Sequence, residues 1–195
     1  TLDRSSAASD VYKRQPFAVA ELVMFVLKQG WACLFGGLLL AAILLTKAVW
    51  QLDWPLHRYD ALFLFAIAIQ AIFLWTKLET WEEARVILLF HFTGTAMEWF
   101  KVDAGSWAYP EPGIFKLMGV PLFSGFMYAA VGSYMARVIR VFDMQFAPYP
   151  RFPLTVLLAG AIYINFSAHH VLPDIRLLLF VATLALYGRT RIWFR

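Results

Sequence analysis

The chain has 195 residues, of which 61% are hydrophobic, 17% aromatic and only 15% charged, with a formal net charge of +4. A soluble domain carries about 25% charged residues, and a water-soluble fold this small cannot hide so much apolar surface. The basic residues gather at the ends of apolar segments, as topology signals do, so nucleic acid is excluded as a partner. The single cysteine, Cys33, excludes a disulfide within the chain and a cysteine-based metal motif.

The beginning of the chain differs in composition from the rest. Residues 1–15 are polar and rich in Ser and Ala, which predicts a disordered leader or a sequence-assembly artefact. Residues 16–195 are expected to form a single transmembrane helical domain. Within it, residues 17–29 are predicted to form a short amphipathic helix that lies in the membrane interface or extends the first span, with a break at Gly30.

Six later segments are apolar and long enough to cross a bilayer core, which takes roughly 20 helical residues. The expected fold class is therefore all-α, a polytopic bundle of about six transmembrane helices. The two longer loops, 103–119 and 142–152, are rich in Gly, Pro and aromatic residues. The predicted spans are residues 31–50, 60–77, 84–102, 120–141, 153–172 and 175–194.

Lys and Arg residues predict the orientation, because they are enriched on the cytoplasmic side of a membrane. With these spans, eleven basic residues fall on one side and five on the other. Both termini are then expected in the cytoplasm, and the loop around Trp107 and the turn at Pro173 outside. The five basic residues of the outer side are Lys47, Arg58, Lys101, Lys116 and Arg176.

Ionisable groups within a span are costly in hydrocarbon, so each requires an explanation. In the third predicted span, His91, Thr95 and Glu98 are four and three residues apart, which places them on one helical face. His91 and Glu98 are about 10 Å apart along the helix axis, because each residue rises 1.5 Å. They can line one polar groove, but they are too far apart to hold one small ion together.

The fifth predicted span carries a second polar group. Asn165 and His169 are one turn apart, whereas His170 points about 100° away. Pro173 ends the helix, and unwinding before it would bring His170 and Asp174 back toward His169. On the predicted topology this cluster lies in the same outer layer as six residues of the third span and its loop, namely Glu98, Lys101, Asp103, Trp107, Tyr109 and Glu111.

This polar layer has a functional and a structural interpretation. Imidazole and carboxylate groups are ligands for first-row metals and useful acids and bases, so a divalent metal held by His169, His170 and Asp174 is one hypothesis. In the structural alternative, His91 and Glu98 satisfy polar groups of neighbouring helices, and His170 caps a helix end. No His-x-x-x-His or Glu-x-x-His pair supports the metal.

Small residues recur through the fourth predicted span and favour close helix packing over any chemical role. They are Ser124, Gly125, Ala129, Gly132, Ser133 and Ala136.

Several ordered motifs carry a family resemblance. The stretches His91–Glu98 (HFTGTAME), Gly105–Glu111 (GSWAYPE), Gly119–Tyr128 (GVPLFSGFMY) and Ile164–Arg176 resemble domain-of-unknown-function family 817, the YoaT-like family of bacterial membrane proteins. The resemblance runs from about Phe17 to Arg195. It implies a multi-pass location in the bacterial inner membrane, no known function, and a longer C-terminus, so that this chain is expected to be truncated relative to the family.

A second, weaker resemblance concerns membrane carotenoid enzymes of the small lycopene cyclase and hydratase type. An acidic residue in a span, a Gly-x-Trp-x-Tyr loop and a Val-Pro-Leu segment are shared with them. Those cyclases continue with acidic residues, where this chain has Phe123 and Ser124. That difference counts against cyclase chemistry.

Three functions follow as hypotheses. The first is a membrane-embedded enzyme acting on a lipid or isoprenoid, with Glu98 as proton donor or acceptor, His91 and His169 as relay or ligand, and Asp174 orienting a histidine. The second is a transporter or permease component that binds a solute in the same groove. The third is a structural or partner-binding membrane protein. The bilayer is the expected surrounding in each.

Overall fold

The computed structural model describes residues 19–51, 53–168 and 172–194, and helices make up most of this part of the chain. Each predicted span contains one helix, so the expectation of a helical fold is confirmed. Four strands of two or three residues were not expected. The helices are an unlabelled N-terminal helix Val19–Ala32, α2 Leu34–Val49, α3 Arg58–Trp75, α4 Trp81–Asp103, α5 Phe123–Val141, α6 Phe152–Ala168 and α7 Arg176–Tyr187.

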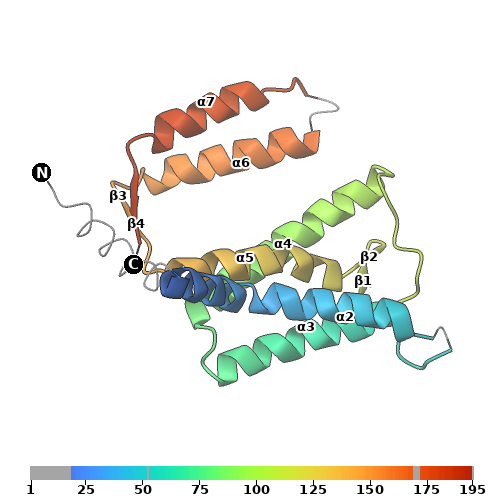
Figure 1. The fold of residues 1–195 in the computed structure, drawn as a ribbon. Coiled ribbons are helices and arrows are strands. Elements are labelled where there is room, and N and C mark those ends of the chain that lie inside the picture. The colour runs from blue at the N-terminus through green and yellow to red at the C-terminus, as the bar shows by residue number, and fades with distance from the viewer. Residues whose placement is uncertain (1–18, 52, 169–171, 195) are drawn as a thin grey trace, which may run out of the picture.

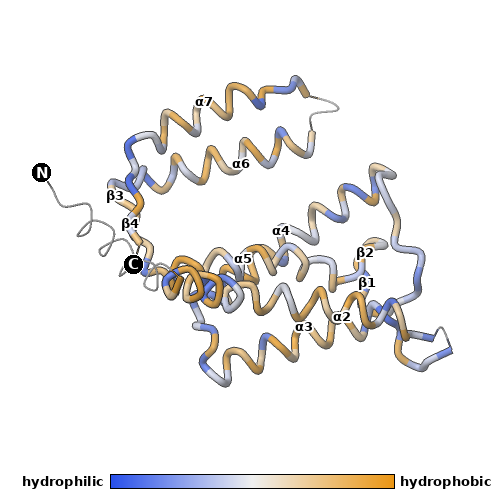
Figure 2. The backbone as a smooth tube through the Cα atoms, viewed as in Figure 1, coloured by the Kyte–Doolittle hydropathy of each residue, from blue (hydrophilic) through white to orange (hydrophobic). Residues whose placement is uncertain are grey.

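The helices α2 to α7 run alternately in opposite directions (Figure 1). Helices α2 to α5 pack together as a bundle, while α6 and α7 form a separate hairpin beside it. Apolar positions predominate along most helices, and many of the hydrophilic positions lie near helix ends and in the loops (Figure 2). This distribution differs from that of a soluble bundle, in which each helix has one polar face.

The predicted helix break at Gly30 is wrong. Gly30 lies inside the N-terminal helix, and the chain instead bends by 62° at Cys33, between Ala32 and Leu34. Arg137 donates a hydrogen bond to the carbonyl of Trp31 over 3.2 Å, and this contact holds the end of the N-terminal helix against α5. The bend is therefore associated with a tertiary contact.

Two predicted span ends are also wrong, because short strands replace helix there. Strands β1 (Lys116–Leu117) and β2 (Val120–Pro121) pair across Met118 and Gly119, both of which have positive φ, as a tight hairpin turn requires. Helix α5 therefore starts at Phe123 and not at 120. After α7, strand β4 (Arg191–Trp193) pairs with β3 (Gln145–Ala147), so the last helix ends at Tyr187.

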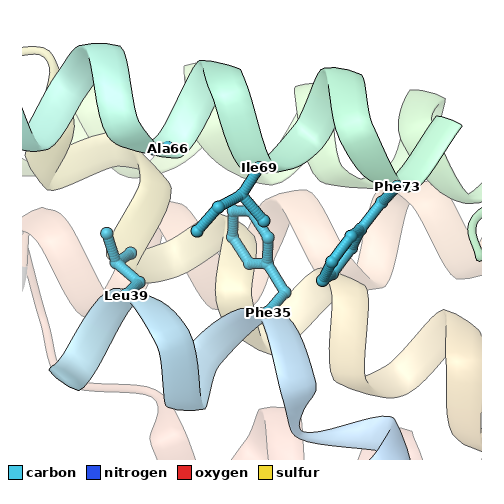
Figure 3. Close-up of a cluster of buried hydrophobic side chains, with 5 residues drawn as sticks. All are labelled: Phe35, Leu39, Ala66, Ile69 and Phe73. Atoms are coloured by element: carbon cyan, nitrogen blue, oxygen red, sulfur yellow. The ribbon is translucent and has the colours of Figure 1, made fainter. Parts of the chain in front are cut away.

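The apolar core of the bundle lies between α2 and α3. Phe35 and Leu39 of α2 meet Ala66, Ile69 and Phe73 of α3, and all five are buried (Figure 3). The rings of Phe35 and Phe73 approach edge to face, with centroids 6.4 Å apart. This cluster holds the N-terminal half of the bundle together.

Helices α4 and α5 make the most extensive helix contact of the structure. A side chain on Gly125 would meet His91 Nδ1 at 2.6 Å and the His91 carbonyl at 2.7 Å, and one on Gly94 would meet Tyr128 at 2.5 Å. Only glycine allows this approach at both positions. The packing role predicted for the small residues of α5 agrees with these contacts.

Among the described residues, α3 alone is a single helix both long and apolar enough to cross a membrane. The bent pair Val19–Ala32 and Leu34–Val49 meets the same measure when the two are taken together. Helices α6 and α7 are apolar but have only 17 and 12 residues. Helix α4 has 23 residues but carries several charged side chains. The structure therefore supports the helices of the predicted bundle, while six membrane spans remain a proposal.

Candidate functional site

Glu98 is the most enclosed acidic side chain of the predicted polar layer, with 1% of its surface exposed. Its Oε2 accepts hydrogen bonds from Trp107 Nε1 at 2.9 Å and from the Tyr109 hydroxyl at 2.7 Å. Its Oε1 accepts one from the Tyr128 hydroxyl at 2.5 Å. We call these residues, together with Lys101, the Glu98 site. They join α4, the loop 104–122 and α5 at one carboxylate.

Lys101 completes this arrangement from the next turn of α4. Its ammonium lies 3.7 Å from Glu98 Oε1 and donates a hydrogen bond to the Tyr128 oxygen over 3.0 Å. An ammonium has no acceptor capacity, so the Tyr128 oxygen accepts this bond and its own proton is directed at Glu98. Lys101, Tyr128 and Glu98 therefore form a hydrogen-bonded chain with a defined direction. The ammonium also lies 4.5 Å from the centre of the Trp107 ring.

The loop 104–122 brings Trp107 and Tyr109 to this place because both of its arms are fixed to other elements. Arg58, at the start of α3, holds Glu111 through two hydrogen bonds of 2.7 and 2.8 Å. Asp60, which is completely buried, accepts bonds from the backbone amides of Ile114 and Phe115, both at 2.8 Å. These anchors leave the loop little freedom to move away from Glu98.

The pKa of Tyr109, in the loop 104–122, is shifted by its contacts in the Glu98 site. Burial, followed by the hydrogen bond to Glu98 and the negative charge of that carboxylate, raises the pKa of the Tyr109 phenol above its ordinary value of 10.0. The phenol therefore remains a hydrogen-bond donor throughout the neutral range.

His91 lies two turns below Glu98 on the same face of α4 and is packed against α5. Its ring centre is 4.3 Å from that of Phe126, and its Nδ1 is buried without a hydrogen-bond partner. The Thr95 hydroxyl bonds to the His91 carbonyl at 2.8 Å. The predicted groove of His91, Thr95 and Glu98 is thus one face, and that face is covered by α5.

A pocket of about 150 Å³ opens beside the Glu98 site, between the end of α4 and α6. Lys101 and Trp107 belong both to the site and to the pocket wall. The remaining walls are mostly apolar. They come from Met97, Phe100, Ala104, Ser106, Phe166 and Ser167.

The other predicted site residues do not contact Glu98 in the described hydrogen bonds. The Asn165 amide donates to the carbonyl of Pro173 at 3.3 Å, Asp174 pairs with Arg176, and Glu111 binds Arg58. His169 and His170 lie outside the described residues. Within the described part, no group of three His, Cys, Asp or Glu side chains is placed to hold a metal. The metal hypothesis at His169, His170 and Asp174 stays a prediction.

A second buried polar cluster lies toward the opposite end of the bundle and was not predicted. We call Gln70, Glu79, Ser133 and Arg137 the Arg137 cluster. Arg137 is fully buried and pairs with Glu79 at 2.5 Å, while Ser133 and Gln70 donate to the same carboxylate. It connects α3, α5 and the turn before α4.

Sequence reasoning placed Lys101 and Trp107 in the same layer as Glu98 without pairing them with it, and it missed Tyr128, which lies 30 residues away in the chain. A signal existed for Lys101, which is three residues after Glu98 on a helix. No sequence signal pairs Glu79 with Arg137, which are 58 residues apart.

Fold and site together define a helix-rich protein with a hydrogen-bonded, buried carboxylate beside an apolar pocket. Residues 21–195 match the family model of a protein of unknown function, DUF817. The chain belongs to this family.

One curated relative is the "Uncharacterized protein YoaT" of Bacillus subtilis (strain 168), which is 43% identical over 159 residues. The match covers 82% of this chain and 60% of that protein, so the chain spans less than two thirds of the length of its relative. No solved structure matches the chain.

Proposed function

We propose that this protein is a multi-pass membrane enzyme that transfers protons to or from a lipid or isoprenoid at the Glu98 site. One observation carries the proposal. The buried carboxylate of Glu98 is linked through the Tyr128 hydroxyl to the ammonium of Lys101, and Lys101 lines a mostly apolar pocket. The mostly apolar walls suit the chain of a lipid or isoprenoid, and Lys101 supplies a charged group at one side of them.

The exposed apolar surface supports the membrane location. Leu157 of α6 is 69% exposed and Leu177 of α7 is 83% exposed, and many other large apolar side chains of the two helices are also open. In water this much apolar surface would be unfavourable, while a bilayer solvates it. The alternating helices place the loops at two opposite levels (Figure 1). Most basic residues of the described part of the chain belong to the segments at one of these levels. The proposed inner membrane orientation, with cytoplasmic termini, follows from this asymmetry.

The proposed chemistry uses the ammonium at the start of the hydrogen-bonded chain. Lys101 holds the proton that is nearest to the pocket, and its ammonium lies 3.7 Å from Glu98 Oε1. Lys101 gives the proton to the substrate, and the neutral amine then accepts a proton from another substrate atom, so the enzyme returns to its starting state. Trp107, Tyr109 and Tyr128 position Glu98, and His91 stiffens the helix contact below it.

Deuterium exchange tests this proposal. The protein is placed in nanodiscs of bacterial lipid extract in D2O, and mass spectrometry measures deuterium bound to lipid carbon. We expect incorporation with the natural sequence and a loss of about tenfold or more in Glu98→Gln and in Lys101→Met. The matched control is Glu82→Gln, because Glu82 is an exposed acid at the first turn of the same helix.

Two results would contradict the proposal. The absence of any incorporation by the natural sequence would remove the enzyme interpretation. If the Glu98→Gln protein unfolds at a lower temperature but incorporates as much deuterium as the natural sequence, the role of Glu98 is purely structural.

A further inference from the structure

We propose that the pocket between α4 and α6 binds an amphiphile with an anionic head group, a phosphate or carboxylate, whose oxygens are bound by Lys101. This inference rests on the proposed function, because it names the class of substrate that the Glu98 site would receive. Three features of the pocket carry it: unused donors, the arrangement of its walls and its charge.

The first feature is the supply of hydrogen-bond donors at the pocket. The Lys101 ammonium has three donors, of which Tyr128 takes one and Glu98 attracts a second. The third is available to the pocket that Lys101 lines, and Ser106 and Ser167 belong to the same wall. A charged donor that faces the pocket fits a ligand with anionic acceptor oxygens.

The second feature is the division of the pocket along α4. Lys101 and Ser106 lie toward the C-terminal end of this helix, whereas Met97 begins the wall one turn earlier. Phe100 and Phe166 supply further apolar surface, and they are 43% and 53% exposed. In the proposed orientation the head group lies at the level of lipid head groups, and the chain extends inward along these side chains.

The third feature is charge. Glu98 carries the opposite charge to Lys101, but its 1% exposure and its bonds from Trp107 and Tyr109 keep its oxygens away from the pocket. Lys101 is therefore the charged side chain that lines the pocket wall. Attraction between its ammonium and an anionic oxygen is strengthened by the apolar walls, because they exclude water.

Native mass spectrometry of the full chain in dodecyl maltoside micelles tests this inference. The probes are farnesyl phosphate and oleate, each compared with its alcohol, farnesol or oleyl alcohol. We expect at least one of the two anions to bind about tenfold more tightly than the corresponding alcohol. This preference should be lost in Lys101→Met and kept in Lys101→Arg. Binding of one anion alone identifies its head group as the one recognised.

The control variant is Lys47→Met, because Lys47 is an exposed lysine in the last turn of α2 and does not line the pocket. Equal binding of anions and alcohols by the natural sequence would overturn the inference, and so would unchanged anion binding by Lys101→Met. Deuterium exchange on the same preparation separates the two proposals. Exchange without head-group preference contradicts only this inference, while preference without exchange contradicts only the enzyme.

Discussion

Glu98 illustrates how single residues make a carboxylate tolerable in an apolar bundle. Transfer of an unpaired carboxylate from water to such an interior is strongly unfavourable. Three hydrogen bonds and one ammonium offset this cost, and they come from α4, the loop 104–122 and α5. Each donor residue therefore contributes both to stability and to the position of the carboxylate.

Tyr109 gives a pH-dependent prediction. Its pKa is raised in the folded protein, so its contribution to stability is fully present below the unfolded value near 10.0 and is lost as the pH rises through the folded value. In a spectroscopic titration of tyrosinate, we expect Tyr109 to contribute to a late step that lies above the ionisation of the exposed phenols. Tyr109→Phe should reduce the amplitude of that late step and cost about 1.5–3 kcal/mol at neutral pH, because the lost bond had a charged acceptor.

The matched control for Tyr109 is Tyr163→Phe, since Tyr163 is 42% exposed on α6. This variant should retain the late ionisation and the stability of the natural sequence. A Tyr109→Phe protein whose late step keeps its full amplitude would contradict the assignment.

Among the helices, the contact of α4 with α5 fixes the geometry of the site. Glu98 and Lys101 lie on one helix and Tyr128 on the other, so a shift between the helices would break the hydrogen-bonded chain. The helices approach closely because glycines face the side chains of His91 and Tyr128. Packing and the candidate site are therefore coupled.

Gly125→Ala tests this close approach. The added methyl group would meet the His91 carbonyl at 2.7 Å, and a backbone atom cannot move away without shifting the helix. We expect a loss of about 1–3 kcal/mol in thermal unfolding, from overpacking. Gly160→Ala in α6 is the control, because no atom lies within 4 Å of the new group, and it should be neutral or stabilising by up to about 1 kcal/mol. Equal effects at both positions would disprove the packing argument.

The Arg137 cluster gives a second prediction about the contacts between helices. Arg137→Met leaves Glu79 buried without its ion pair, and we expect a loss of about 3–5 kcal/mol. Adding Glu79→Gln should restore much of the loss, since the uncompensated charge is then gone. Denaturation of the single and double variants measures this coupling.

The exposed pair of Arg176 with Asp174 provides the comparison, and Arg176→Met should change stability little. Additive effects of Arg137→Met and Glu79→Gln would contradict the pairing.

At the scale of the whole molecule, the predicted topology determines on which side of the membrane the Glu98 site lies. The Glu98 site lies at the end of the bundle where α4 ends, and the Arg137 cluster lies toward the other end (Figure 1). If the basic level is cytoplasmic, the Glu98 site belongs to the outer side of the membrane. Orientation thus decides from which leaflet a ligand would enter.

Cysteine labelling tests the orientation. In a Cys33→Ser background, an Ala108→Cys protein should react with an impermeant maleimide added to whole cells, because residue 108 lies in the exposed loop after α4. Arg151→Cys, in the exposed segment before α6, should react only after the membrane is opened. The opposite pattern would invert the proposed topology, and equal labelling of both would contradict the membrane proposal.

Local sequence was sufficient to predict the helical class, the six helices α2 to α7 within about three residues at most ends, and the shared face of His91, Thr95 and Glu98. These properties depend on local composition and on the period of the helix. The ordered motifs were also sufficient to indicate the family, which the match over residues 21–195 confirms.

Only the folded structure shows which side chains contact one another. Tyr128 reaches Glu98, Arg137 reaches Glu79 and Arg58 reaches Glu111 across 30 to 58 residues of chain. The bend at Cys33 lies beside a contact between distant residues, and β3 pairs with β4 from the other end of the hairpin α6–α7. Strands β1 and β2, in contrast, form a local hairpin. The contacts between distant residues arise from the packing of helix faces, and local propensity carries no information about the partner of a side chain.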